Sequence, residues 1–510
     1  MVVAAAADHW IGVDIGTSAC KVLALNSEGQ VAAVSTRAYP LHTPRPGWAE
    51  QDPEAWWQAS DECIQEVLAQ LPAHSEVRGF GLCGQMHGLT ALDDRGEVLR
   101  PAILWNDQRA APQCAQITER AGGLPHLLGL VSNRMLPGFT AGKVLWLREH
   151  EPQAYSRMRH LLNPKDYLRL RMTGGYVTDV SDASGTGLFD VADRRWSAEL
   201  LGLLDIHESL LPRVVESHEV TGHLLPELAH RWCLPETTPV VGGGGDSVLQ
   251  TTSMGIIDSG TLGVTIGTAG IVGAASRFCP QDLDGRLQIS CGNAPGRWHV
   301  MGVSLSAGGA FHWLRESLMP LMNETSLGYP RLVELAKQAP AGAEGLLFLP
   351  YLVGERCPHE SPQARGSWVG LNPLHSVAHM SRSVMEGTIL NLREIVSMFV
   401  AAGLKWSQVR VSGGATTEPL WLQLLADVLQ QEVTTVTGAE QGGAFGAALL
   451  AGVGTGRWAS MDEAAALVHE TTGITPDRAV ARLYDRLFVV HRQLFEALEP
   501  SFTALAEAGL

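Results

Sequence analysis

Residues 12–18 read Gly-Val-Asp-Ile-Gly-Thr-Ser and residues 263–269 read Gly-Val-Thr-Ile-Gly-Thr-Ala, so that five of the seven positions agree. Each stretch is a short apolar segment that runs into a Gly-Thr turn, after which apolar residues resume, as in two strands joined by a turn. The two copies begin 251 residues apart in a chain of 510 residues. Chance agreement between glycine-rich segments is the alternative. We predict two related domains, residues 1–256 and 257–510, that each present a Gly-Thr turn to a shared cleft.

The residues that follow the first copy decide the type of domain. Residues 21–25 form a second apolar strand, residues 26–29 a turn and residues 31–36 a third strand, which together predict a β-hairpin. A dinucleotide-binding fold has a helix after its first glycine turn, so that fold is excluded. Further along, strands alternate with helices, which indicates an α/β architecture. Strands are predicted over 10–14, 79–83, 239–241, 298–303 and 409–412, and helices over 53–71, 419–430 and 443–452.

Two helical segments carry more specific expectations. The small residues of 443–452 predict close packing of that helix against a neighbour. Apolar residues at helical spacing between Leu483 and Leu498 predict a C-terminal amphipathic helix. Because proline does not fit a helix interior, Pro500 is predicted to end it.

The overall charge argues against polyanionic partners. The chain has 37 Lys and Arg against 53 Asp and Glu, a formal net charge of −16, and such a surface repels nucleic-acid phosphates and anionic membranes. An uncharged stretch at 259–276 contains five glycines and three threonines, which suit strands and turns better than a membrane helix. Eight scattered cysteines without a Cys-x-x-Cys pair predict reduced thiols. With no signal-peptide pattern at the N-terminus, we expect a cytoplasmic protein and leave a homodimer open.

Glycine turns at strand ends leave backbone N–H groups free to bind anions, above all phosphate. The chain has four such turns, at 16–18, 267–268, 308–309 and 413–414. Each alone fits an ordinary tight turn. Together they favour a nucleotide-phosphate site.

Two aspartates lie beside strand ends of this kind. Asp14 precedes the first Gly-Thr turn, and a carboxylate next to a bound phosphate is unfavourable unless a cation such as Mg²⁺ lies between them. Asp246 follows four glycines at 242–245, and a carboxylate displayed in that way suits a general base. Alternatively, Asp14 stabilises its turn and Asp246 caps a helix that begins near Ser247.

Two polar segments suit the binding of a polyol. Residues 85–88 read Gln-Met-His-Gly and residues 105–109 read Trp-Asn-Asp-Gln-Arg. An apolar side chain can contact the C–H face of a sugar while His, Asn and Asp hydrogen-bond its hydroxyls. The alternative is a structural role, since a lone histidine and most tryptophans serve the core.

Two long segments identify a family. Residues 138–150 read Gly-Phe-Thr-Ala-Gly-Lys-Val-Leu-Trp-Leu-Arg-Glu-His, and Gly-Ser-Trp-Val-Gly-Leu at 366–371 is followed by Ser-Val-Met-Glu at 383–386. Over nearly all of residues 10–495 the chain thus resembles the FGGY carbohydrate kinases. The likeness is greatest to the bacterial branch that acts on D-xylulose, in the segments 48–53, 84–88, 104–107, 164–171, 181–183 and 349–356.

The resemblance implies an α/β fold of two actin-like, ribonuclease H-like ATPase domains around an interdomain cleft. It implies that Asp246 deprotonates the attacking sugar hydroxyl, and that Asp14 and Asp246 hold Mg²⁺ through water. The sugar-binding residues expected from the polar segments and the resemblance are Met86, His87, Asn106, Asp107, Asp246 and Ser247. The expected nucleotide-binding residues are Thr17, Ser18, Lys21, Gly267, Thr268, Gly308, Gly413 and Gly414.

The reaction implied by the resemblance is ATP-dependent phosphorylation of D-xylulose to D-xylulose 5-phosphate in pentose catabolism, with ATP and Mg²⁺ as cofactors. A kinase for ribulose or another polyol is the nearest alternative, although Met86-His87 stands where glycerol-specific members carry Arg-Glu. An actin- or chaperone-like ATP-binding protein and a catalytically silent sugar sensor are alternatives of other classes. Three positions depart from the family pattern, since Ser247 and Glu418 stand in place of Asn and Ala269 in place of Ser.

Overall fold

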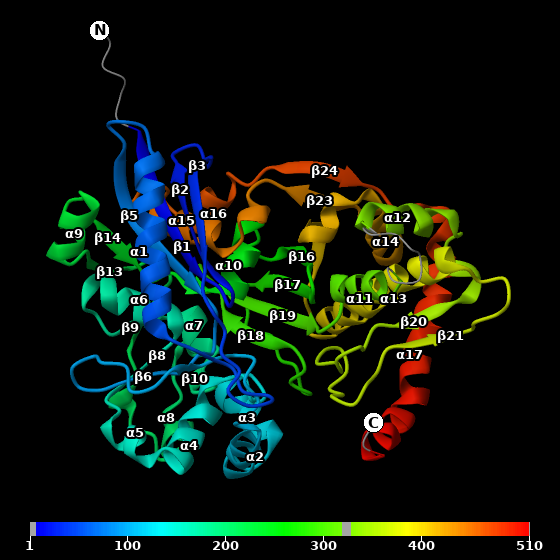
Figure 1. Cartoon of the computed structure of the whole chain (residues 1–510), viewed down its shortest axis with the longest axis horizontal. Coiled ribbons are helices and arrows are strands. Elements are labelled where there is room, and N and C mark those ends of the chain that lie inside the picture. Colours follow the sequence, from blue (N-terminus) through cyan, green and yellow to red (C-terminus); the bar gives the residue numbers. More distant parts are fainter. Residues whose placement is uncertain (1–6, 319–327, 509–510) are drawn as a thin grey trace, which may run out of the picture.

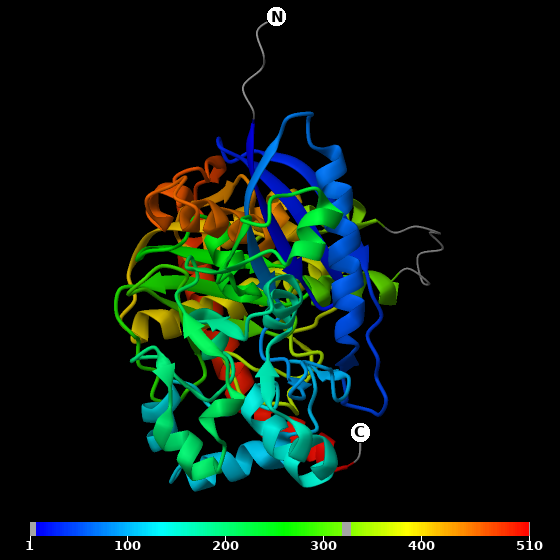
Figure 2. The same ribbon diagram turned by 90° about the vertical axis from the view of Figure 1, so that its left-hand side faces the viewer.

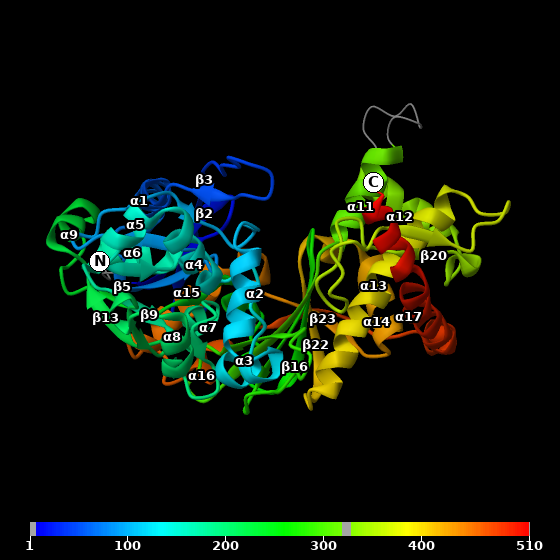
Figure 3. The same cartoon turned by 90° about the horizontal axis from the view of Figure 1, so that it is seen from below.

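The computed structural model describes residues 7–318 and 328–508, which form two lobes with one large mixed sheet each (Figure 3). The N-terminal sheet has seven strands in the order β13-β14-β5-β1-β2-β3, with β15 beside β5. Its strands are β1 (Asp8–Ile15), β2 (Ala19–Asn26), β3 (Val31–Ala38), β5 (Glu76–Gly84), β13 (Val220–His223), β14 (Pro239–Val241) and β15 (Gly244–Gly245). As predicted, β1, β2 and β3 form consecutive antiparallel hairpins.

The C-terminal sheet also has seven strands, in the order β18-β19-β17-β16-β22-β23-β24. They are β16 (Gly260–Ile266), β17 (Gly270–Ser276), β18 (Gln288–Cys291), β19 (Trp298–Ser304), β22 (Trp406–Ser412), β23 (Val433–Val436) and β24 (Glu470–Ile474). The hairpin β16-β17 and the parallel pair β16-β22 repeat the hairpin β1-β2 and the parallel pair β1-β5. The sequence repeat at 12–18 and 263–269 therefore occupies the same place in two sheets of matching topology, and the uncharged segment 259–276 is a hairpin.

Helices and small sheets surround these cores (Figure 1). In the N-terminal half, the remaining elements are β4 (Glu50–Gln51), α1 (Pro53–Gln70), β6 (Thr90–Leu92), β7 (Ala102–Ile103), α2 (Ala111–Arg120), α3 (Leu124–Val131), α4 (Thr140–His150), α5 (Pro152–Arg157), β8 (His160–Leu162), α6 (Pro164–Thr173), β9 (Val177–Asp179), α7 (Val180–Ser184), β10 (Phe189–Asp190), β11 (Arg195–Trp196), α8 (Ala198–Leu204), β12 (Arg213–Val215), α9 (Pro226–Trp232) and α10 (Asp246–Ser253). In the C-terminal half, they are α11 (Gly308–Leu318), α12 (Tyr329–Gln338), β20 (Leu347–Leu349), β21 (Ser367–Val369), α13 (Val377–Ala401), α14 (Pro419–Leu429), α15 (Gly443–Gly454), α16 (Met461–Ala465) and α17 (Arg478–Glu507).

Helix α15 joins the two halves of the molecule. Although it lies late in the sequence, it packs against β1 and β5 of the N-terminal sheet, as the orange ribbon beside the blue strands shows (Figures 1 and 2). The approach is very close, because a Cβ atom at Gly12 would lie 1.9 Å from the carbonyl oxygen of Ala444, and one at Gly81 would lie 1.8 Å from that of Ala447. The prediction of close packing by this small-residue helix is confirmed.

Replacing Gly81 with alanine should destabilise the protein by about 3 kcal/mol, at the upper end of the usual cost of overpacking a core. The added methyl group has to displace the backbone of α15 or of β5, since the carbonyl of Ala447 occupies its place. Urea unfolding measures the effect. Gly202→Ala in α8 is the matched control, because no atom lies within 4 Å of its added Cβ and alanine favours a helix. Equal midpoints for both variants would contradict the assigned packing.

The C-terminal helix differs from its prediction. Helix α17 spans Arg478–Glu507 and contains Pro500 in its interior, so the prediction that this proline ends the helix was wrong. A proline removes one backbone hydrogen bond and often kinks a helix without ending it. The continued helix buries Phe502 in a small apolar cluster with Phe495 and Leu349, and this burial offsets the lost bond.

Among the described residues, no helix combines the length and the apolar character that a membrane span requires.

Candidate active site

A cleft of about 800 Å³ lies between the two large sheets. Its lining includes Asp14 at the end of β1 and Asp246 at the start of α10 on one side, and the turn after β22 with Gly413 on the other. Ala269, from the second copy of the repeat, also lines it. The prediction that the two Gly-Thr hairpins face one cleft is therefore consistent with the structure.

Asp14 and Asp246 bring two carboxylates into this cleft, and neither has an ion-pair partner among the residues that the structure describes. Burial raises the pKa of Asp14, and its Oδ1 atom is buried without a hydrogen-bond partner. Burial and then the charge of Asp14 raise the pKa of Asp246 to about 7, although backbone N–H groups of Ser247 and Met86 act against the rise. A carboxylate with a pKa near neutrality is suited to accept a proton from a hydroxyl.

The glycine segment 242–245, just before Asp246, packs very closely against the residues around it. A Cβ atom at Gly243, where φ is +71°, would lie 2.0 Å from the carbonyl oxygen of Leu82, and one at Gly245 would lie 2.6 Å from the side chain of Met86. Only glycine at these positions allows the segment to pass so closely. Asp246 itself is the first residue of α10, and its Oδ1 accepts a hydrogen bond of 2.7 Å from the backbone N–H of Ser247.

Two side chains, Arg169 and Ser181, make hydrogen bonds to the backbone of this glycine segment. The guanidinium of Arg169 donates to the carbonyl oxygen of Val241 at 2.7 Å and to that of Gly242. The hydroxyl oxygen of Ser181 accepts a hydrogen bond of 3.1 Å from the N–H of Gly245. Both ends of the segment 242–245 thus form hydrogen bonds with buried polar groups, and these bonds fix the position of the Asp246 backbone.

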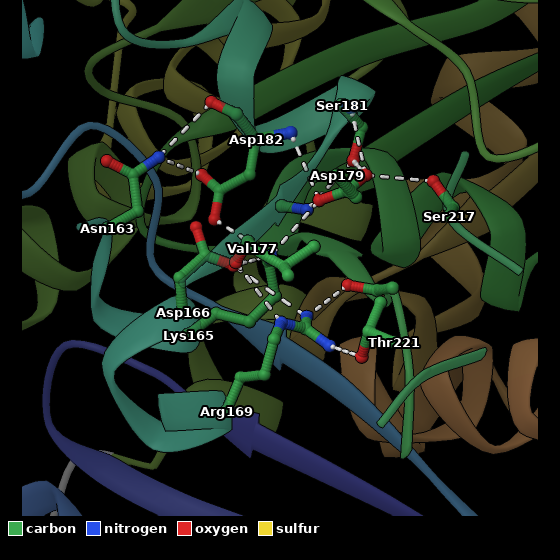
Figure 4. A network of polar contacts seen from close by, with 12 residues as sticks. Asn163, Lys165, Asp166, Arg169, Val177, Asp179, Ser181, Asp182, Ser217 and Thr221 are labelled. Carbon is green, nitrogen blue, oxygen red and sulfur yellow. Dashed lines mark hydrogen bonds and ion pairs between the residues drawn. The ribbon is translucent and has the colours of Figure 1, made fainter. Parts of the chain in front are cut away.

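Arg169 and Ser181 belong to a buried network of three carboxylates and two cations (Figure 4). The Nζ atom of Lys165 lies 3.1 Å from Asp179 and 3.5 Å from Asp182. Asp179 in turn accepts from the hydroxyl of Ser181 at 2.6 Å. Burial, together with its neighbouring carboxylates, raises the pKa of Asp182 well above its usual range. Because removal of one partner from such a network leaves a buried charge uncompensated, the network provides a rigid support for the segment that carries Asp246.

Met86 and His87 lie in the cleft near Asp246, as predicted. The Nδ1 atom of His87 lies 2.6 Å from the carbonyl oxygen of Gly185, and its ring stacks on Phe139 at a centroid distance of 4.6 Å. Burial lowers the pKa of His87 to about 3, so the ring is neutral. Since Nδ1 donates its hydrogen to Gly185, Nε2 is left as a hydrogen-bond acceptor.

The family signature at 138–150 lies behind this histidine. Lys143 donates hydrogen bonds of 2.8 Å to the carbonyl oxygen of His87 and 2.7 Å to that of Gly138, and the hydroxyl of Thr140 donates to the same oxygen of His87 at 3.0 Å. Burial lowers the pKa of Lys143 to about 7. These bonds hold His87 in its left-handed backbone conformation, with φ of +69°.

Asn106 and Asp107, predicted as sugar contacts, do not line the cleft. Asp107 is fully buried, and its carboxylate accepts a hydrogen bond of 2.6 Å from the backbone N–H of Ala49 and others from Arg109. Its oxygen atoms are therefore engaged in a structural role. Their neighbour Trp105 does line the cleft, and its indole N–H donates to the hydroxyl of Thr17 at 2.9 Å.

A second cavity, of about 590 Å³, continues from the cleft into the C-terminal lobe. Gly267, Thr268 and Gly308 line it, and Gly414 lines both the cavity and the cleft. Its walls also include the aromatic side chains of Phe311, Tyr329 and Trp421, together with Glu418. Glycine turns at one end and aromatic surfaces at the other suit the phosphates and the base of a nucleotide.

The remaining predicted nucleotide ligands lie at the first hairpin. Lys21 lines the cleft, and its Nζ atom is 3.4 Å from the carbonyl oxygen of Glu440. Thr17 and Ser18 lie in the turn beside the cleft without lining it. Gly413 does line it.

Several lining residues were not predicted as ligands. Arg356 and Gln288 line the cleft near Met86 and His87, and Phe311, Tyr329 and Trp421 line the nucleotide cavity. Arg356 ends the segment 349–356, which was quoted only for its resemblance to the family. Gln288 and the aromatic residues stand in no motif, so the sequence carried no signal for them.

Mg²⁺ fits the carboxylate pair. The Oδ1 atom of Asp14 is buried without a partner, and the charge of Asp14 raises the pKa of Asp246, so a cation between them would relieve both costs. Within residues 7–318 and 328–508, no group of three or more His, Cys, Asp or Glu could hold a metal ion. Mg²⁺ needs no such group, because one or two carboxylates, water and substrate phosphates complete its coordination.

Two lobes with sheets of matching topology, a cleft between them and glycine turns on the facing hairpins define the class of two-domain actin-like ATPases. The comparison with protein families makes this more specific. The N-terminal domain of the FGGY family of carbohydrate kinases matches residues 9–253, and the C-terminal domain of that family matches residues 262–455. The chain therefore belongs to the FGGY family and is a carbohydrate kinase, an enzyme that transfers a phosphoryl group to a sugar.

Its relatives agree with this assignment. A xylulose kinase of Escherichia coli (strain K12) is 39% identical over 96% of this chain and 99% of its own length. A xylulose kinase of Bacillus subtilis (strain 168) is 37% identical over 97% of this chain and 98% of its own length. The crystal structure of a xyloylose kinase from Brucella ovis superposes with a TM-score of 0.90 at 33% identity, covering 96% of this chain and 99% of that one.

Proposed function

We propose that this carbohydrate kinase transfers the γ-phosphoryl group of ATP to the 5-hydroxyl of D-xylulose, giving D-xylulose 5-phosphate in pentose catabolism. The xylulose kinases among its relatives support the choice of sugar. The observation that carries the proposal is the position of Asp246, whose pKa is about 7, in one cleft with Met86, His87 and the glycine turns. We also propose that the enzyme works in the cytoplasm, where ATP is available.

In this proposal Asp246 is the general base. Its carboxylate accepts the proton of the sugar hydroxyl as that oxygen attacks the γ-phosphorus. The support of residues 242–245 by Arg169 and Ser181 keeps the carboxylate in place. The neutral His87 accepts a hydrogen bond from a sugar hydroxyl through Nε2, and the side chain of Met86 contacts the carbon chain of the sugar.

The charge of the phosphates is balanced locally, despite the net charge of −16. Lys21 and the backbone N–H groups of Thr268, Gly413 and Gly414 face the phosphates. The N–H groups of Gly267 and Gly308 already donate to the carbonyl oxygens of Ala269 and Gly267, so these two glycines only line the cavity. Asp14 and Asp246 would hold Mg²⁺ through water, and the ion would neutralise charge on the phosphates. The base of ATP lies in the cavity lined by Phe311, Tyr329 and Trp421.

The three departures from the family pattern all lie at this site. Ser247 and Ala269 line the cleft, and the hydroxyl of Ser247 donates to the sulfur of Met86 at 3.1 Å. Ser247 is shorter than the Asn of relatives, so it leaves more room beside the sugar. Glu418 lines the nucleotide cavity, and its carboxylate is a hydrogen-bond acceptor for an amino group of the base.

The proposal is tested by measuring ADP release from MgATP in the presence of D-xylulose, D-ribulose, L-ribulose, xylitol and glycerol. We expect D-xylulose to raise the rate at least about 100-fold over the sugar-free rate, because the nucleophile is then a bound hydroxyl and not water. A ribulose as the best substrate would move the assignment to the nearest alternative. Slow hydrolysis that no sugar stimulates would overturn the proposal in favour of an actin-like ATPase.

A further inference from the structure

The proposed reaction places a chemical demand on the site that Asp246, Met86 and His87 do not meet. A 2-ketopentose closes to a furanose by bonding O5 to C2, and O5 is the atom that is phosphorylated. The enzyme must therefore bind the open-chain form, in which C2 is a carbonyl. A carbonyl oxygen only accepts hydrogen bonds, so the site needs a donor at that end of the sugar.

The sugar end of the cleft is the region where it meets two small cavities. The residues shared between the cleft and these cavities are Met86, His87, Ser247, Gln288, Met301 and Arg356. In this set, Nε2 of His87 is an acceptor and the hydroxyl hydrogen of Ser247 is given to the sulfur of Met86. The side-chain donors that remain are the guanidinium of Arg356 and the amide of Gln288.

Arg356 faces the cleft with an unpaired charge. Its guanidinium makes no ion pair and donates no hydrogen bond to any residue that the structure describes. The neighbouring Glu355 offers no charge compensation, because its carboxylate accepts bonds from Ser304 at 2.8 Å, from the N–H of Leu305 at 2.9 Å and from Asn391 at 2.8 Å. These bonds fix the segment from which Arg356 projects.

The other charges around Arg356 are already paired. In the small cavity beside it, Arg134 forms an ion pair with Glu360, and Arg286 forms one of 2.8 Å with Asp284. Burial lowers the pKa of Arg356 to about 10, so the group stays charged at neutral pH. Arg356 is partly buried and lines both the cleft and the small cavity, so its guanidinium is free to donate hydrogen bonds to a ligand there.

Gln288 supplies a second donor from the first residue of β18. Its Nε2 atom is buried and has no hydrogen-bond partner. It lines the cleft and both small cavities. The side chain therefore stands where the cavities converge, beside His87 and Arg356.

We propose that Arg356 and Gln288 donate hydrogen bonds to the C2 carbonyl oxygen of an open-chain 2-ketose and so select this form and this class of sugar. The inference rests on the proposed function. It gives the C-terminal domain a direct role in sugar recognition, whereas the base and His87 come from the N-terminal domain. The C-terminal lobe then contacts the nucleotide and the C2 end of the sugar, while the N-terminal domain supplies the proton acceptor, Met86 and His87.

The test combines a variant with a substrate that lacks one atom. The analogue is the pentitol obtained by reduction of 2-deoxy-D-xylose, which keeps the hydroxyls at C3, C4 and C5 of D-xylulose but has no oxygen at C2. The variant is Arg356→Met, which keeps length and removes every donor. We expect kcat/KM for D-xylulose to fall about 10- to 100-fold, the usual loss of a hydrogen bond from a charged donor, and kcat/KM for the analogue to change less than about 3-fold.

Arg286→Met is the matched control, since it removes a neighbouring arginine that is already paired, and it should leave both values near those of the wild type. Gln288→Met gives an independent reading with a smaller effect, about 3- to 10-fold, confined to D-xylulose. Equal losses on both substrates in Arg356→Met and Gln288→Met, or no loss on D-xylulose, would overturn the inference. A wild type that prefers D-xylonate would also overturn it, because the guanidinium would then serve a carboxylate. If wild type acts on no ketopentose at all, it is the proposed function that fails.

Discussion

Asp246→Asn should lower kcat for D-xylulose phosphorylation by about 1,000-fold, within the range that a positioned general base contributes. Asparagine has the size of aspartate and can still accept the hydrogen bond that the N–H of Ser247 gives to Asp246. It cannot take up the proton of the attacking hydroxyl. The loss should therefore fall on kcat, with little change in KM for ATP, because the nucleotide cavity does not include residue 246. Steady-state kinetics with saturating D-xylulose measures it.

The same variant separates catalysis from folding. The folded-state pKa of Asp246 is raised to about 7, largely by burial, whereas an unfolded aspartate has a pKa near 3.9. A raised carboxyl pKa means that ionised Asp246 destabilises the native state once pH rises above the unfolded value, with the full penalty above the folded value. Asp246→Asn should thus unfold at the same or a higher urea concentration at pH 8. A large loss of stability would instead assign the inactivity to misfolding.

Asp205→Asn is the control for this substitution. Asp205 is exposed and follows α8 in a left-handed conformation that asparagine tolerates well. The substitution Asp205→Asn removes one negative charge at a residue that does not line the cleft, so the variant should keep wild-type kinetics. Near-normal turnover by Asp246→Asn would refute the assigned base.

Much of the fold could be predicted because it repeats. The agreement between 12–18 and 263–269 reports a hairpin used in both lobes, and the strand-turn-strand pattern after Asp14 was enough to exclude a dinucleotide-binding fold. The small residues of the helix at 443–452 also predicted its close packing. Its partner could not be read from the sequence, since nothing local indicates that a helix so late in the chain covers β1 and β5.

The site was predicted in part, and the limits have physical causes. Asp14 lies at the end of β1, and Met86, His87 and Asp246 lie just after strand ends, where a local sequence pattern indicates residues that face a site. Asp107 has a similar pattern, but its carboxylate already accepts hydrogen bonds from the distant Ala49 and from Arg109. Whether a polar side chain is free or already bonded depends on contacts distant in sequence, so Asp107 was predicted as a ligand and Gln288 was not.

Asp14→Asn should lower kcat/KM for D-xylulose about 100-fold or more, through the loss of a carboxylate that we propose to hold Mg²⁺ beside the phosphates. The Oδ1 atom of Asp14 has no partner in the protein, so the substitution breaks no hydrogen bond made by that atom. Raising the Mg²⁺ concentration should recover part of the activity, because weakened metal binding is overcome by mass action. Asp8→Asn, at the opposite end of the same strand, is the control, since within the described residues Asp8 forms an ion pair only with exposed Arg78.

The pH profile of Asp14→Asn distinguishes a charge effect from simple damage to the site. The negative charge of Asp14 is one cause of the raised pKa of Asp246, so its removal must lower that pKa. The activity of the wild type should therefore rise with pH through the pKa of Asp246, and at saturating Mg²⁺ the acidic limb of the variant should lie at lower pH, even though its plateau is lower. If the limb stays in place or moves to higher pH, Asp14 and Asp246 do not interact as the geometry of the cleft requires, and the pairing of the two carboxylates around one cation is wrong.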